Sequence, residues 1–163
     1  MGERLLTAAR DAVQEVAETM LFLEIKSGTA DHHRCDVDGE VSALVAMSGG
    51  VEGAVRLSGP SSTVIPMASA LLGEEREEMD QELEDAFLEL GNMVAGGIQV
   101  RIETKYGDIT ITPPVLFNGE EHPIFSEGDL SVCNHRFELQ GKLFFVEIYY
   151  DEERLGRVAE KES

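Results

Sequence analysis

The sequence predicts a two-layer α+β fold in which long helices cover a mostly antiparallel sheet. Two segments, 5–23 and 82–107, carry apolar residues three or four positions apart, which is the helical spacing. Pairs of short, β-branched or aromatic segments joined by tight turns stand at 41–57 and 130–150 and predict two hairpins. Each long helix comes before a hairpin, so we expect a pseudo-twofold repeat whose hairpins merge in one sheet.

Length and composition favour one domain over residues 1–163, with a charged tail at 151–163. The hydrophobic fraction of 42% is ordinary for a globular protein. The 32 acidic residues outnumber the 13 basic ones, and the net charge of −19 disfavours nucleic acid and anionic membranes as partners.

Neither a membrane segment nor a disulfide framework is predicted. No run of about 18 apolar residues occurs, and the first residues lack the apolar core of a signal peptide. Two cysteines, Cys35 and Cys133, are too few for a disulfide-stapled domain. We therefore expect a cytoplasmic protein with free thiols.

The first half begins with the helix at 5–23, whose inward stripe repeats at helical spacing. Its members are Leu6, Ala9, Val13, Val16, Ala17 and Met20. A polar loop is expected at 27–39, followed by strands at 41–47 and 51–57 around the turn Ser48-Gly49-Gly50.

The second half follows a break at Gly59-Pro60. A short helix is expected from Ser61 or Ser62 to Gly73, and Asp80 is a candidate cap for the long helix. The remaining expected segments, in order, are an acidic linker at 74–81, a strand at 109–112 that Pro113-Pro114 ends, a loop at 116–127, and strands at 130–139 and 143–150.

The long helix carries an unusual outer face. Its apolar stripe comprises Leu83, Phe87, Leu90, Val94 and Ile98. Glu89 and Asn92 lie off that stripe, three residues apart and on one face, so both should be exposed. Gly91, Gly96 and Gly97 each cost about 1 kcal/mol of helix stability relative to alanine. Either the glycines let another element pack closely and Asn92 is merely solvated, or this face is functional.

Glu89-Leu90-Gly91-Asn92 matches the Glu-x-x-Asn motif of the CheC/CheX/FliY phosphatases of bacterial chemotaxis. The next residues, Met93 to Gly97, also resemble that family, and the resemblance covers about residues 5–150. It implies a two-layer fold with a duplicated half. Double-motif relatives repeat Glu-x-x-Asn on the first helix, whereas Glu15-Val16-Ala17-Glu18 here has glutamate in place of asparagine. We expect one working site per chain.

The resemblance also implies a reaction, the hydrolysis of phospho-aspartate on a CheY-type receiver domain. Asn92 would position the attacking water, and Glu89 would pair with the receiver's active-site lysine. Small residues would allow close approach of the partner. The residues expected to contact it are Asp85, Ala95, Gly96 and Gln99. The chain would need no cofactor of its own, because the receiver would bring Mg²⁺.

A homodimer is expected from the same resemblance and from the last strand, in which Phe145 stands beside Val146 and both faces are apolar. Two other functions remain open. The helix face could bind a receiver or organise a dimer without hydrolysis. A metal-dependent enzyme would instead use a histidine and cysteine cluster formed by His32, His33, Cys35, Cys133 and His135. The spacing of that cluster is not that of a zinc site, and we expect no metal ligands there.

Overall fold

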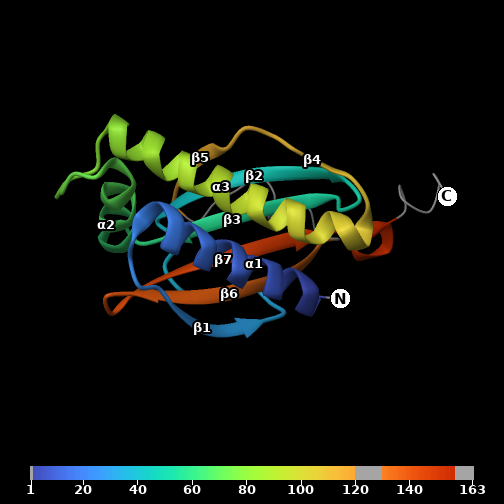
Figure 1. Ribbon diagram of the computed structural model, residues 1–163. Helices are drawn as coiled ribbons and strands as arrows, with labels where there is room; N and C mark the ends of the chain where they lie inside the picture. The colour runs from blue at the N-terminus through green and yellow to red at the C-terminus, as the bar shows by residue number, and fades with distance from the viewer. Residues whose placement is uncertain (1, 120–129, 157–163) are drawn as a thin grey trace.

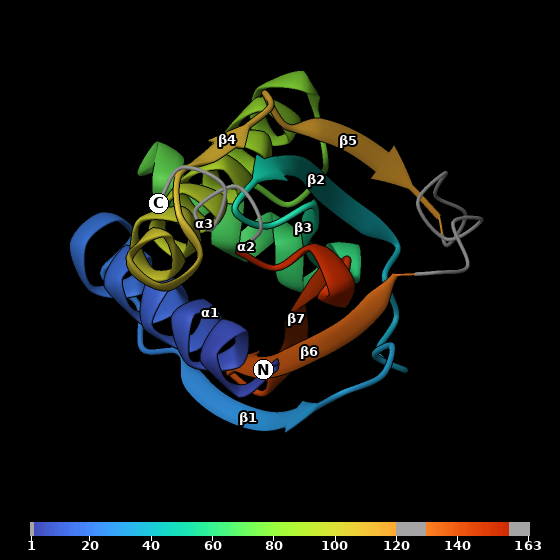
Figure 2. The same ribbon diagram turned by 90° about the vertical axis from the view of Figure 1, so that its right-hand side faces the viewer.

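The computed structural model describes residues 2–119 and 130–156. Its seven-stranded sheet has three α-helices on one face, and α1 and α3 run side by side across that face (Figure 1). The sheet curves around this helical layer (Figure 2). The elements in chain order are α1 (Gly2–Val16), a π-helical turn (Ala17–Leu21), β1 (Lys26–Asp31), β2 (Val41–Gly49), β3 (Gly53–Gly59), α2 (Ser61–Leu72), α3 (Gln81–Tyr106), β4 (Ile109–Ile111), β5 (Val115–Asn118), β6 (Ser131–Leu139), β7 (Lys142–Tyr150) and a short 3₁₀ turn (Glu152–Arg154).

The pseudo-twofold repeat is visible in the strand order β1-β6-β7-β3-β2-β4. The two hairpins, β2–β3 and β6–β7, meet in the middle, where β3 pairs with β7. In each half, the first strand after the long helix pairs with the hairpin of the other half: β1 pairs with β6, and β4 pairs with β2. The halves therefore exchange their edge strands, which ties each helix–hairpin unit to the other.

Both predicted long helices and both predicted hairpins are confirmed, and the predicted α+β fold with its antiparallel sheet is correct. The predicted inward stripe of the first helix was wrong at Met20, which is 42% exposed because the helix changes to a π-helical turn at Ala17–Leu21. Two predicted loops were wrong in part. The segment 27–39 contains most of β1, and the segment 116–127 begins inside β5, while residues 120–127 lie outside the described part of the chain. β1 was missed because five of its six residues are exposed, so its sequence lacks an apolar alternation. Its pairing with β6 makes it a strand.

The argument from the last strand to a homodimer also needs correction. β7 lies between β6 and β3 and is not an edge of the sheet. Phe145 and Val146 are both buried, since the loop before β2 and the helices cover opposite faces. A dimer stays a prediction that rests on the family resemblance alone. Among the described residues, no helix has both the length and the apolar character needed to cross a membrane.

Candidate functional site

α3 is the longest helix and presents the candidate site. Asp80 caps it as predicted, because its Oδ1 accepts a hydrogen bond from the backbone N–H of Leu83 at 2.9 Å. The predicted apolar stripe is buried throughout. Leu83, Phe87, Leu90, Val94 and Ile98 are between 0 and 3% exposed. Because these residues face the core, the helix is held in one rotational setting and its opposite side faces outward.

Glu89 and Asn92 both lie off the buried stripe. Glu89 is exposed as predicted, whereas Asn92 is half-buried and was predicted to be exposed. Neither side chain makes a hydrogen bond to any residue within the described ranges. An exposed carboxylate can pair with an incoming cation, and a free amide can both donate and accept a hydrogen bond. The pair is therefore available to another molecule.

The three glycines of α3 have different roles. A methyl group at Gly91 would lie 2.7 Å from the Cβ of Ala43 in β2, and one at Gly97 would lie 2.9 Å from the Cβ of Ala12 in α1. These two glycines let α3 pack closely on the sheet and on its neighbouring helix. Around Gly96, by contrast, nothing lies within 4 Å of the position a Cβ would take. Packing thus explains Gly91 and Gly97, whereas Gly96 is an opening in the outer face beside Asn92.

The residues predicted to contact a partner differ in their surroundings. Asp85 is exposed and accepts a hydrogen bond from Gln81 at 3.0 Å. Gln99 is half-buried, and its Nε2 donates to the backbone carbonyl of Ile109 at 2.6 Å, which fastens α3 to β4. Ala95 requires a correction: it is 0% exposed, so its methyl group belongs to the core and does not lie on the surface.

On α1, Glu15 and Glu18 stand at the positions that correspond to the glutamate and the asparagine of the motif. Glu15 forms an ion pair with Arg101 of α3 at 2.7 Å, and the same guanidinium donates to the carbonyl of Gly97 at 2.9 Å. Glu18, where the motif would have asparagine, is exposed in the π-helical turn. This face of α1 therefore holds a bridge between two helices.

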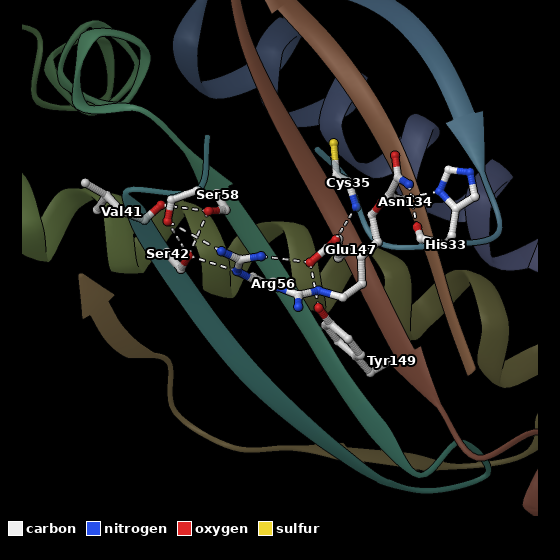
Figure 3. Close-up of polar contacts among 11 residues, drawn as sticks. His33, Cys35, Val41, Ser42, Arg56, Ser58, Asn134, Glu147 and Tyr149 are labelled. Atoms are coloured by element: carbon white, nitrogen blue, oxygen red, sulfur yellow. Dashed lines mark hydrogen bonds and ion pairs between the residues drawn. The ribbon is translucent and has the colours of Figure 1, made fainter. Parts of the chain in front are cut away.

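The histidine and cysteine residues do not converge. Cys133 is buried on the helical side of the sheet, and burial raises the pKa of its thiol to about 12. Cys35 lies across the opposite face, where its backbone N–H donates to Glu147 (Figure 3). His33 lies on that face as well, since its carbonyl accepts a hydrogen bond from Asn134. Within residues 2–119 and 130–156, no three His, Cys, Asp or Glu side chains are placed to hold a metal ion.

The sequence reasoning missed two apolar side chains that the structure exposes. Val100 of α3 is 59% exposed, and Phe22, just beyond the π-helical turn, is 81% exposed. Helical spacing could have identified Val100, which lies eleven residues, and about 20° of rotation, from Glu89. No sequence pattern predicts the conformation that exposes Phe22.

The chain is similar in sequence and in fold to known chemotaxis proteins. The family model "Chemotaxis phosphatase CheX" matches residues 41–138. The CheY-P phosphatase CheX of Thermotoga maritima is 30% identical over 132 residues, which cover 78% of this chain and 84% of that protein. A CheC-like superfamily protein from Shewanella sp. PV-4 superposes with a TM-score of 0.79 at 25% identity, over 92% of this chain and 99% of that one. CheX from a Borrelia burgdorferi CheX–CheY–BeF₃–Mg²⁺ complex has a TM-score of 0.74 at 29% identity, with coverage of 90% and 97%.

Proposed function

This chain belongs to the CheX family of chemotaxis phosphatases, and from that premise we propose that it hydrolyses the phospho-aspartate of a CheY-type receiver domain. The observation that carries the proposal is the free pair Glu89 and Asn92 on the outer face of α3, beside the opening at Gly96. The solved complex of the Borrelia relative with CheY, BeF₃ and Mg²⁺ supports a receiver as the partner.

Neither side chain of the pair is a strong nucleophile. Water must therefore attack the phosphorus, and the chain's contribution is to place that water in line with the bond that breaks. Asn92 suits this role because its amide can accept a hydrogen bond from water with its oxygen, and donate to a phosphoryl oxygen or to the water with its nitrogen.

Glu89 lies one turn before Asn92 and is exposed. We assign it to an ion pair with a lysine at the receiver's active site, which would set the register of the two proteins. The ion pair with a cation there would offset the free energy that the carboxylate loses when it leaves water. Mg²⁺ would be held by the receiver, and its charge would offset that of the phosphoryl group. Gly96 has no side chain to block the close approach that this insertion requires.

The test is the decay of phosphorylated receivers. Several CheY-type receivers are phosphorylated with a small acyl phosphate in the presence of Mg²⁺, and loss of the phosphoryl group is followed with and without the chain. We expect faster decay, in proportion to the amount of chain added, and no acceleration by Asn92→Ala.

Other outcomes point to the alternative functions. Complex formation with unchanged decay for every receiver would favour a non-catalytic receiver-binding module. Stoichiometric metal in the purified chain, with activity lost on chelation and not restored by the receiver's Mg²⁺, would favour a metal-dependent enzyme. Either result would remove the proposed mechanism.

A further inference from the structure

Two side chains of α3 hold both backbone polar groups of one residue of the sheet. The Gln99 amide donates to the carbonyl oxygen of Ile109 at 2.6 Å, and the Ile109 N–H donates to Glu103 Oε2 at 2.9 Å. Ile109 is the first residue of β4, which ends the strand order of the sheet. Alternate residues of an edge strand turn these groups away from the sheet, where no neighbouring strand pairs with them. Gln99 and Glu103 therefore form a clamp between the helix and the edge of the sheet.

The clamp lies on the flank of α3 that carries Asn92. Gln99 follows Asn92 by seven residues and Glu103 follows it by eleven, which places each within about 20° of Asn92 around the helix axis. The three side chains thus stand in one line along the helix. The Asn92 amide is half-buried and makes no hydrogen bond to any described residue, so only packing against its surroundings can restrain it.

The chain that follows Ile109 leads back along the same flank. It reverses after α3 ends at Gly107 and continues through β4 towards β5, and α3 contacts both strands (Figure 1). A strand advances about 3.3 Å per residue and a helix about 1.5 Å, so the segment from Ile109 to Pro113 spans about nine residues of α3. That length leads from the middle of the clamp to the level of Asn92. The fixed φ of proline makes this border of Asn92 stiff.

The opposite flank of α3 has a fastening of its own. Arg101 follows Asn92 by nine residues, which is about 180° of rotation around the helix axis. Its guanidinium donates to Glu15 of α1 at 2.7 Å and to the carbonyl of Gly97 at 2.9 Å. α3 is therefore fastened once to α1 and once to the edge of the sheet, and of these two fastenings the clamp is the one in line with Asn92.

We propose that Gln99 and Glu103 are positioning residues for Asn92, and that the Gln99 amide does not contact the receiver. The inference rests on the proposed function, in which the Asn92 amide must meet a water and a phosphoryl oxygen in one geometry. A catalytic group has to be held within about 0.5 Å of its productive position, and the residues that fix its surroundings set this precision. The clamp holds the border beside Asn92 against α3 before a receiver arrives. Its loss should slow turnover and leave binding intact.

The test measures rate and affinity separately. Gln99→Met keeps the length and helix propensity of the side chain but cannot donate to Ile109. We expect the maximal single-turnover rate of receiver dephosphorylation to fall about tenfold, the scale for displacing a reacting group by a fraction of an ångström, with the receiver Kd within about twofold of wild type. Glu103→Met should act in the same direction. Glu103→Gln should retain the wild-type rate, because its amide oxygen still accepts from the Ile109 N–H.

Arg101→Met is the matched control, since it removes the fastening on the other flank. Urea midpoints should fall by similar amounts in Gln99→Met and Arg101→Met, whereas only Gln99→Met should slow turnover. A second readout needs no receiver. In NMR relaxation measurements on the free chain, the side-chain amide of Asn92 should become more mobile in Gln99→Met and should be unchanged in Arg101→Met.

Three outcomes would overturn the inference while the proposed function stood. They are an unchanged rate for Gln99→Met, equal slowing by Arg101→Met, and a rise in Kd without loss of rate, which would make Gln99 a receiver contact. If the wild-type chain accelerates no receiver, the proposed function fails. The mobility of the Asn92 amide then still decides whether the clamp positions it, and equal mobility in wild type and Gln99→Met would exclude that role.

Discussion

Arg56 and Glu147 lie directly opposite one another where β3 meets β7, and their Nη1 and Oε1 atoms are 2.8 Å apart (Figure 3). The side chains are 1% and 0% exposed. Glu147 also accepts from the Tyr149 hydroxyl at 2.7 Å and from the Cys35 backbone at 2.6 Å, while Arg56 donates to Ser42 at 2.9 Å. A buried ion pair with its hydrogen bonds satisfied thus joins the two halves of the molecule.

Glu147→Gln should therefore destabilise the fold strongly. It leaves the Arg56 guanidinium buried without a counter-charge, and breaking such a pair from one side costs about 3–5 kcal/mol. Urea unfolding followed by circular dichroism measures the loss. Glu138→Gln on neighbouring β6 is the control, since that carboxylate is not fully buried, and it should change stability little. Equal effects of the two changes would show that the pair contributes nothing special.

Asn92→Ala should separate binding from catalysis in the proposed reaction. We expect receiver affinity close to wild type and a rate lower by roughly two to three orders of magnitude, the scale for losing one positioned polar group. Asn92→Asp should be at least as damaging, because a carboxylate cannot donate and would face phosphoryl oxygens. Single-turnover decay beside a binding isotherm measures both. If Asn92→Ala turns over at the wild-type rate, a group other than Asn92 positions the attacking water.

Glu89→Ala should weaken binding as well as turnover. Cutting one side of a desolvated charge pair at an interface costs about 2–5 kcal/mol. Added salt should weaken binding by the wild-type chain more than by the variant. Glu138→Ala serves as the control, because β6 places it on the face of the sheet opposite α3. Identical salt dependence in wild type and Glu89→Ala would mean that Glu89 makes no ionic contact.

Gly96→Ala and Gly97→Ala form a matched pair one residue apart. Gly96→Ala has open space for its methyl group, so helix propensity should raise stability by up to about 1 kcal/mol. Gly97→Ala should destabilise, since its methyl would meet the Cβ of Ala12 at 2.9 Å. If Gly96 is open for the receiver, its alanine variant should lower receiver affinity while remaining stable. Unchanged affinity would show that Gly96 has no role in docking.

His135 should make the fold sensitive to acid. It is 6% exposed and stacks on Phe137 with 4.6 Å between ring centroids, and burial lowers its pKa below the ordinary 6.5. The unfolded chain therefore binds a proton at higher pH than the folded one. Stability contributed by neutral His135 is complete above about pH 6.5 and declines as pH falls towards the folded-state pKa.

The measurement compares urea midpoints at about pH 7.5 and about pH 5. Wild type should lose more stability across this interval than His135→Gln, which cannot titrate. His33→Gln is the control, since the His33 side chain is exposed. An equal loss for wild type and His135→Gln would mean that other groups cause the acid sensitivity.

Local patterns in the sequence determined where the main elements form. The stripe from Leu83 to Ile98, the Asp80 cap and the alternating hairpin strands depend on residues a few positions apart, whose geometry is set by the helix or strand itself. The same periodicity placed Glu89 and Asn92 off the buried face, because rotation per residue is a property of any helix. The family resemblance of the Glu-x-x-Asn segment was likewise contained in the sequence.

Only the tertiary structure decided what each position meets. β1 forms because it pairs with β6, and its sequence has no apolar alternation that would predict a strand. Arg56 is buried on the face of β3 that points away from the helices, and its burial depends on the loop before β2 and on Glu147, 91 positions away. The glycines of α3 could not be told apart by sequence, since Gly91 and Gly97 meet other elements and Gly96 does not. The exposure of Phe22 depends on the left-handed end of a π-helical turn that packs against α2. In each instance the deciding contact joins residues far apart in the chain, which no local pattern encodes.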